Sequence, residues 1–218
     1  MALEHAFSSA SGRTLNDCHF LTRRWDPKAD PDEGKIESSI FMRDRDASVG
    51  VRWLHGRYSD LFRLPSGRVY VATVTGEVES NDDPVRGTPW TRHREINATR
   101  IWGLSDDLVF AWSTVRKEVH VFDGSRWTTH AVPDRIYDIH GTSPDLIMAA
   151  GFFIGRWDGS SFAPMSAGPR PVFTQVHVVS EDEMYANYDR RAIWEGSVYG
   201  WAERTTPIGA ADLKYVAK

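Results

Sequence analysis

The sequence contains one cysteine, Cys18, among its 218 residues. A single cysteine excludes an internal disulfide and any zinc site built from several cysteines. Long apolar runs are also missing, because none approaches the roughly 20 residues that cross a bilayer as a helix. The first residues carry neither the basic head nor the long apolar stretch of a secretory signal. We therefore expect a cytoplasmic protein that has no membrane partner.

Positive charge is not in excess either. Lys and Arg total 26 and Asp and Glu total 30, which gives a formal net charge of −4. A dedicated nucleic-acid binder usually has a basic excess, so no nucleic-acid partner is expected. The sequence also lacks a Walker loop, a Gly-x-Ser-x-Gly elbow and a His-Glu-x-x-His motif. Without these motifs we expect no catalytic residues, no cofactor and no metal.

Aromatic residues, in contrast, are abundant, with nine Trp, seven Tyr and ten Phe, and they favour strands. A Gly-x-x-aromatic pattern recurs with gaps of 37, 37, 35 and 37 residues between its glycines. An acid precedes the glycine in the last three copies, and Asp-Gly favours a hairpin turn because the turn needs positive φ. We expect each copy to be a hairpin whose aromatic residue packs in the core. The five copies are Gly50…Trp53, Gly87…Trp90, Gly124…Trp127, Gly159…Phe162 and Gly196…Tyr199.

A second sequence pattern recurs with the same spacing. An alanine ends an apolar triplet in four successive repeats, and a serine stands six residues before it. The alanines are Ala72, Ala111, Ala149 and Ala186, and the serines are Ser66, Ser105, Ser143 and Ser180. Each repeat then holds four short strands in roughly 40 residues, which is typical of a propeller blade. One such sheet cannot bury both faces alone, so the blades must stack on one another.

Two hairpins carry a resemblance to a known class. Phe122-Asp-Gly-Ser-Arg-Trp127 and Trp157-Asp-Gly-Ser-Ser-Phe162 follow a W-D-G-x-x-W pattern. On these residues the chain resembles small bacterial β-propeller repeat proteins, over residues ~58–205, and in size it is similar to immunity-type inhibitors. The resemblance implies a fold and does not by itself imply an activity.

We therefore predict a single all-β domain over residues 1–218, a five-bladed β-propeller with four-stranded blades. One step of 37 from Val176 reaches Leu213, so residues 212–216 are expected to form an innermost strand. The first repeat lacks the serine-led start. The C-terminal strand is therefore expected to join the N-terminal blade and close the ring, which removes exposed strand edges. Residues 1–12 are expected to be a flexible arm. A six-bladed ring and a β-sandwich are the competing architectures. The chain has too few residues after Tyr199 for a sixth blade, and a β-sandwich does not explain a repeat of about 37 residues.

The innermost strands supply the candidate site, because propellers bind ligands where these strands converge. Residues three and five before each serine alternate with an apolar set, Phe62, Ile101, Ile139, Val176 and Leu213. A metal site is disfavoured because basic residues in the same ring would repel a cation. The competing interpretation is that these side chains only satisfy backbone groups. The candidate partner- or ligand-binding residues are Arg63, Arg100, Trp102, Asp138, His140, His177, Asp212 and Lys214.

These features favour a non-enzymatic, monomeric protein-binding propeller. By analogy with immunity proteins of similar size and style, we expect it to occlude another protein, such as a bacterial toxin domain. A carbohydrate-binding lectin, with Trp and Tyr stacked on sugars, is the alternative. A small glycoside-acting enzyme that uses Asp138 and Asp212 as a carboxylate pair is the third choice. His93 and His130 both follow a hairpin tryptophan by three residues, so we expect them to be structural.

Overall fold

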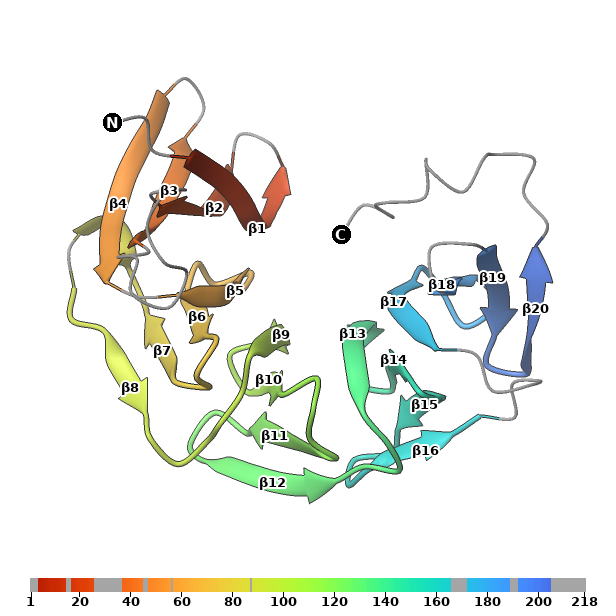
Figure 1. Ribbon diagram of the computed structural model, residues 1–218. Coiled ribbons are helices and arrows are strands. Elements are labelled where there is room, and N and C mark those ends of the chain that lie inside the picture. The colour runs from red at the N-terminus through yellow and green to blue at the C-terminus, as the bar shows by residue number, and fades with distance from the viewer. Residues whose placement is uncertain are drawn as a thin grey trace. The chain divides into compact units, whose positions relative to one another are not determined.

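The computed structural model shows the strands that the repeat predicted (Figure 1). It describes residues 4–14, 17–25, 37–44, 47–55, 57–86, 88–165, 172–188 and 192–204. Within these ranges the regular structure is strand apart from one short 3₁₀ turn, η1 (Pro84–Arg86). The strands form five four-stranded sheets, and in each sheet the hydrogen-bonded neighbours are consecutive along the chain.

The five sheets follow one another in sequence order. The first contains β1 (Glu4–Thr14), β2 (Asp17–Trp25), β3 (Glu37–Asp44) and β4 (Ala47–His55). The second contains β5 (Tyr58–Arg63), β6 (Val69–Thr73), β7 (Val78–Asn81) and β8 (Thr91–His93). The third contains β9 (Arg100–Ser105), β10 (Leu108–Trp112), β11 (Glu118–Phe122) and β12 (Trp127–Ala131). The fourth contains β13 (Ile136–Ser143), β14 (Leu146–Gly151), β15 (Ile154–Trp157) and β16 (Phe162–Pro164). The fifth contains β17 (Phe173–Val178), β18 (Met184–Tyr188), β19 (Ala192–Ser197) and β20 (Gly200–Arg204).

The chain divides into two compact units, residues 1–111 with 123–127 and residues 112–122 with 128–218. In each unit apolar side chains from two successive sheets pack together, which is why one sheet of the repeat is not stable alone. In the first unit this core joins the first and second sheets through Leu21, Ile40, Tyr58, Leu61, Val69 and Val71. In the second unit it joins the fourth and fifth sheets, and its members include Met148, Ile154, Phe173, Val176 and Trp194.

The N-terminal residues differ from the prediction. The expected flexible arm, residues 1–12, largely belongs to β1, which pairs with β2 from Glu4 opposite Trp25 to Thr14 opposite Asp17. The first sheet therefore takes all four of its strands from N-terminal residues. The prediction of a C-terminal strand in this sheet assumed that the sheet lacks a strand, and that assumption was wrong. Residues 212–216 lie outside the described residues, and closure of a ring stays a prediction.

Two of the repeated hairpins have the predicted turn. Gly124 and Gly159 have φ values of 91° and 97°, a region that glycine enters without steric cost. The preceding aspartates cap these turns. Asp123 Oδ1 accepts the backbone N–H groups of Ser125 and Arg126, and Asp158 Oδ1 accepts those of Ser160 and Ser161.

At the two ends of the chain the glycine marker does not indicate a turn. Gly50 lies inside β4 and Gly196 lies inside β19. In the fifth sheet Ser197 pairs with Gly200, so the turn falls on the two residues between them. Tyr199 is therefore 86% exposed, and the predicted packing of this aromatic is wrong. Trp201 packs against Gly196 instead, where an added Cβ would meet its ring at 2.3 Å.

Candidate functional site

The predicted site residues that the structure describes lie in the first strands of the second to fifth sheets. Three of these strands, β5, β13 and β17, contain a bulge at the same place. A bulge separates Ile136 from Asp138 in β13 and Phe173 from Gln175 in β17. In β5 the bulge separates Tyr58 from Asp60. The bulge aligns Asp60 with Asp138 and Gln175.

This alignment corrects the register that the serines suggested for β5. Leu61, which follows Asp60, is 2% exposed and takes the buried position that Val176 occupies in β17. The prediction had placed Phe62 there. Phe62 instead stands at the position of His177, and Arg63 is one residue further on. Arg63 is therefore not the equivalent of the site histidines.

Side chains of one first strand bind the backbone of the next first strand. In the second unit Asp138 Oδ2 accepts the backbone N–H of Val176 at 3.1 Å. Two residues later His140 Nδ1 accepts the N–H of Val178, also at 3.1 Å. A first strand lies at the edge of its sheet, so its outward N–H groups have no strand partner and need another acceptor. Asp138 and His140 thus satisfy backbone groups, as the competing interpretation held.

The same arrangement occurs in the first unit. Asp60 Oδ2 accepts the backbone N–H of Ile101 at 3.1 Å, while Asp60 Oδ1 binds the Ser9 hydroxyl at 3.0 Å. The hydroxyl of Ser11 accepts the N–H of Arg63 at 2.9 Å. β1, β5 and β9 are thereby joined by side chains, and the buried carboxylate of Asp60 is used for this purpose.

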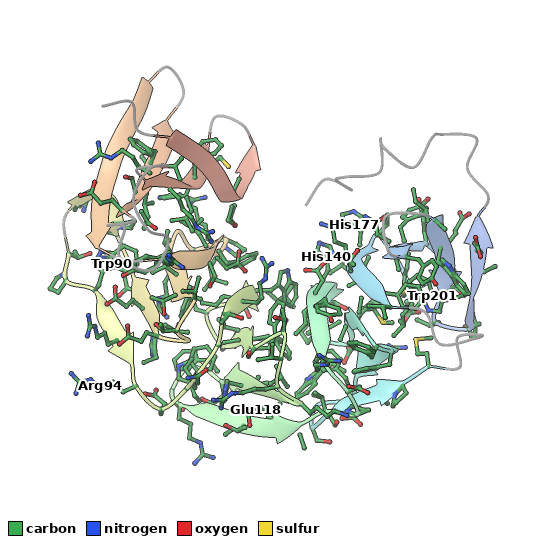
Figure 2. The ribbon with its side chains drawn as sticks, in the orientation of Figure 1. Trp90, Arg94, Glu118, His140, His177 and Trp201 are labelled. Carbon is green, nitrogen blue, oxygen red and sulfur yellow. The ribbon has the colours of Figure 1, made fainter. Side chains whose placement is uncertain are left out.

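Aromatic rings of successive first strands meet two residues after this carboxylate. His140 and His177 lie beside each other, with ring centroids 4.7 Å apart and an interplanar angle of 33° (Figure 2). Phe62 and Trp102 form the corresponding contact in the first unit, at 6.3 Å. Both histidines are half-buried, so each presents part of its ring to solvent. No group of three or more metal-binding side chains occurs in the described part of the chain.

Arg23 of β2 lies against the start of β5, and its pKa is influenced by two other arginines. Arg23 donates from Nε and Nη2 to the carbonyl oxygen of Tyr58, at 2.9 and 2.6 Å. Burial lowers the pKa of Arg23, and the positive charges of Arg100 and Arg57 lower it further. Within the residues that the structure covers, neither Arg23 nor Arg100 forms an ion pair with a carboxylate. Sequence reasoning selected Arg100 but missed Arg23, since the two residues lie in different sheets.

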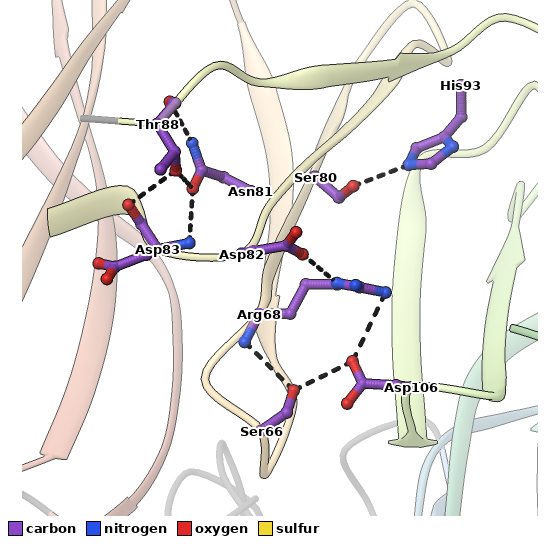
Figure 3. Close-up of polar contacts among 9 residues, drawn as sticks. All are labelled: Ser66, Arg68, Ser80, Asn81, Asp82, Asp83, Thr88, His93 and Asp106. Carbon is purple, nitrogen blue, oxygen red and sulfur yellow. Dashed lines mark hydrogen bonds and ion pairs between the residues drawn. The ribbon is translucent and has the colours of Figure 1, made fainter. Parts of the chain in front are cut away.

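A second polar network lies between the second and third sheets (Figure 3). Arg68 forms ion pairs with Asp82 and Asp106, and the Ser66 hydroxyl also donates to Asp106 at 3.0 Å. The serine and its acidic neighbours therefore link adjacent sheets through their turns. This network ties up Arg68, which leaves it unavailable as a free cation for a ligand.

The hairpin histidines have the structural role that was predicted. Trp127 Nε1 donates to His93 Nδ1 at 3.1 Å, so Nε2 carries the ring proton and donates to Ser80 Oγ at 2.9 Å. Burial lowers the pKa of His93 and so favours this neutral form. His130 makes an equivalent edge contact with Trp157, with ring centroids 5.3 Å apart.

A pocket of about 320 Å³ lies on the second sheet. Val78 and Ile96 contribute apolar surface, and Arg92 and Arg94 flank it. Arg92 binds the buried carboxylate of Glu79 at 2.9 Å and is thus held by the protein itself. The pocket was not predicted from the sequence, because among its lining residues only His93 belongs to a repeated marker.

Two predicted site residues, Asp212 and Lys214, lie outside the described residues. In the part of the chain with described structure, no helix has the length and apolar character needed to cross a membrane.

Comparison with known proteins gives the fold. No protein-family model matches the chain, and no curated protein matches it. Two similar solved structures are those described as "YCF48 bound to D1 peptide" and "YCF48 from Cyanidioschyzon merolae". The first is 12% identical, with a TM-score of 0.57, and the match covers 92% of this chain and 69% of that chain. The second is 10% identical, with a TM-score of 0.59, and the match covers 94% and 72%. At these identities the likeness is one of fold, and the chain is a β-propeller repeat protein.

Proposed function

We propose that this chain is a non-enzymatic protein-binding propeller that occludes its partner, in the manner of an immunity-type inhibitor in the cytoplasm. The structure described as YCF48 bound to a D1 peptide supports protein binding, since a propeller of similar fold there holds a segment of another protein. In this proposal the partner is a bacterial toxin domain. Occlusion needs no chemistry from the propeller, only a surface that the partner matches.

Arg23 and Arg100 carry the proposal. The charges of Arg57 and Arg100 act on Arg23, and no carboxylate among the described residues forms an ion pair with Arg23 or Arg100. Like charges held together raise the free energy of the unbound surface, and an anionic ligand relieves that cost. A guanidinium also binds a carboxylate through two parallel hydrogen bonds, which gives both affinity and orientation.

The partner surface is therefore acidic. Of the two arginines, Arg100 is better placed to bind a partner carboxylate, because Arg23 already donates two hydrogen bonds to the Tyr58 carbonyl. A carboxylate of the partner bound to Arg100 lies next to β9, at the edge of the third sheet. Arginine is also among the residues that most often dominate the binding energy of protein interfaces.

The test begins with capture of the partner from the native host and continues with the two purified proteins. Isothermal titration calorimetry then compares wild type with Arg100→Glu and with Arg94→Glu. Arg94 is an exposed arginine that projects from the segment after β8 (Figure 2), so it controls for net charge. Arg100→Glu is expected to raise Kd at least tenfold, and Arg94→Glu is expected to leave it within about twofold.

Equal effects of the two substitutions would show only long-range attraction and would reject the site. An unchanged Kd for Arg100→Glu would reject it as well. Binding of a sugar in a glycan array, with no captured protein, would instead favour the lectin alternative.

A further inference from the structure

The pocket on the second sheet contains neither arginine of the proposed partner site. Its walls are the turn between β6 and β7, the strand β8 and the segment that follows β8. Two backbone bonds fix the turn, from Gly76 N–H to the Thr73 carbonyl at 3.1 Å and from Thr73 N–H to the Glu77 carbonyl at 2.9 Å. A third bond, from Ala98 N–H to the Gly76 carbonyl at 2.9 Å, joins the turn to the segment after β8. Hydrogen-bonded backbone therefore forms the pocket before any ligand binds.

Two residues of opposite charge, Glu77 and Arg92, line this pocket. Arg92 lies directly opposite Glu79 in the register of β7 and β8. Glu77 stands two residues before Glu79, so it belongs to the same face of the sheet. Glu77 and Arg92 are thus diagonal neighbours, and such positions lie roughly 7–8 Å apart in an antiparallel pair.

The guanidinium of Arg92 is oriented by the protein and still has donors to offer. Its Nε donates to Glu79 Oε1 at 2.9 Å, and the Glu79 side chain is buried. The pKa of Arg92 is raised first by this hydrogen bond and then by the negative charges of Glu79 and Glu77. Its two terminal nitrogens make no hydrogen bond or ion pair within the described residues. They can therefore bind a carboxylate through parallel hydrogen bonds.

The carboxylate of Glu77 is available as well. The side chain is exposed, and it forms no hydrogen bond or ion pair in the part of the chain that the structure describes. Val78 and Ile96 line the pocket but are 1% and 7% exposed, so little apolar surface is open to a ligand. The volume of about 320 Å³ is also at the small end of the range for ligand pockets. A ligand that carries both charges and one short apolar group matches these features.

We propose that this pocket binds a free α-amino acid with a short apolar side chain. The carboxylate of the ligand accepts hydrogen bonds from the Nη atoms of Arg92, and its ammonium group donates to the Glu77 carboxylate. The apolar side chain contacts Ile96. One carbon atom carries both charged groups of such a ligand, so it fits between two opposite charges that are diagonal neighbours. The inference goes beyond the proposed function and does not depend on it.

Titration of the ¹⁵N-labelled full-length chain with valine, followed by NMR, tests the proposal. Valine is expected to bind with a Kd below about 5 mM, which is within reach of a ligand of this size. The backbone amides that shift are expected to be those of residues 76–78 and 92–97. N-acetylvaline lacks the ammonium group and valinamide lacks the carboxylate, so each is expected to bind at least about tenfold more weakly.

Two substitutions separate the contacts of the ligand. Glu77→Gln removes the charge of an exposed side chain and is expected to weaken valine binding at least about tenfold, while the weaker binding of N-acetylvaline stays unchanged. Arg92→Lys keeps a positive charge opposite Glu79 but loses the parallel donors, and is expected to weaken valine binding at least about threefold. Arg86→Gln is the matched control, because Arg86 is an exposed arginine between β7 and β8 that does not line the pocket. It is expected to leave the Kd within about twofold of wild type.

A Kd of about 5 mM or higher for valine overturns the proposal. Equal affinities for valine and its two analogues overturn it as well, since the two charges of the ligand are then not recognised. Amide shifts confined to other parts of the chain, or equal effects of Glu77→Gln and Arg86→Gln, would show that this pocket is not the site.

Discussion

Asp138 accepts the backbone N–H of Val176, at 3.1 Å, across the boundary between two sheets. The two residues are 38 positions apart, one repeat of the sequence. Asp60 makes the same bond with Ile101 in the first unit. A carboxylate that looks like a ligand-binding group in the sequence thus serves as a link between successive sheets.

Replacing this carboxylate is expected to destabilise the protein. Asp138 is 3% exposed, so Asp138→Ala leaves a buried N–H without an acceptor, at a cost of about 1–3 kcal/mol in the free energy of unfolding. Asp138→Asn keeps a carbonyl oxygen and is expected to cost less. Urea denaturation measures both. Asp145→Ala, at an exposed turn, is the control and is expected to remain within about 0.5 kcal/mol of wild type.

A stability of Asp138→Ala equal to that of wild type would show that the N–H of Val176 finds another acceptor. The linking role would then be wrong.

Alanine substitutions at the two turn glycines distinguish the energetic cost of a left-handed backbone from the cost of steric crowding. At Gly159, with φ 97°, an added Cβ meets nothing within 4 Å, so Gly159→Ala reports the cost of the left-handed backbone, about 1–2 kcal/mol. At Gly124 the Cβ would lie 3.2 Å from that of Asp107, so Gly124→Ala is expected to cost more. Thermal and urea unfolding measure the difference. Gly200→Ala, which has open space and no positive φ, is expected to be close to neutral.

His93 is expected to make the protein less stable in acid. Burial lowers its pKa below the ordinary 6.5, so the unfolded chain takes up a proton at a higher pH than the folded chain does. Its contribution is therefore complete above pH 6.5 and is lost as the pH falls below that value. The difference in unfolding free energy between wild type and His93→Gln, measured from pH 8 to pH 5, should be flat above about pH 7.5 and then decrease. A difference that does not vary with pH would contradict the lowered pKa.

Asp123 is expected to titrate far below an ordinary aspartate. The Ser125 hydroxyl, followed by the backbone N–H groups of Arg126 and Ser125, lowers the pKa of Asp123 to about 2. Carboxyl-carbon NMR measures this pKa directly. Ser125→Ala removes the first donor and should raise the pKa toward 3.8, whereas Ser160→Ala in the neighbouring hairpin should not change it. The stability that the hydrogen-bonded carboxylate provides is present above pH 3.8 and is lost as the pH falls toward 2.

Much of the architecture follows from particular positions in the sequence. Ala72, Ala111, Ala149 and Ala186 are all buried strand residues, as their recurrence indicated. Gly124 and Gly159 form the expected turns. Gly50 and Gly196 share the pattern but lie inside strands. The predicted number of sheets was correct even though these two copies of the marker were misread.

The candidate site was less accessible from the sequence. The residues beside the buried position were recognised as polar, and Asp138, His140 and His177 do lie together. The chain has one more residue between Asp60 and Ser66 than it has between Asp138 and Ser143, so counting back from the serine placed the register of β5 one residue too late. The influence of Arg100 on Arg23 could not be predicted either, since it depends on how successive sheets pack.

By itself the sequence determined the class of fold and the number of repeats, because burial and turn preference act on neighbouring residues and recur with the period of the chain. Only the tertiary structure decided what the polar residues do. Asp138 and His140 meet their hydrogen-bond partners across about one repeat, and the charge of Arg100 in the third sheet acts on Arg23 in the first. Such contacts are set by the packing of one sheet on the next, which the order of residues within a single repeat does not encode.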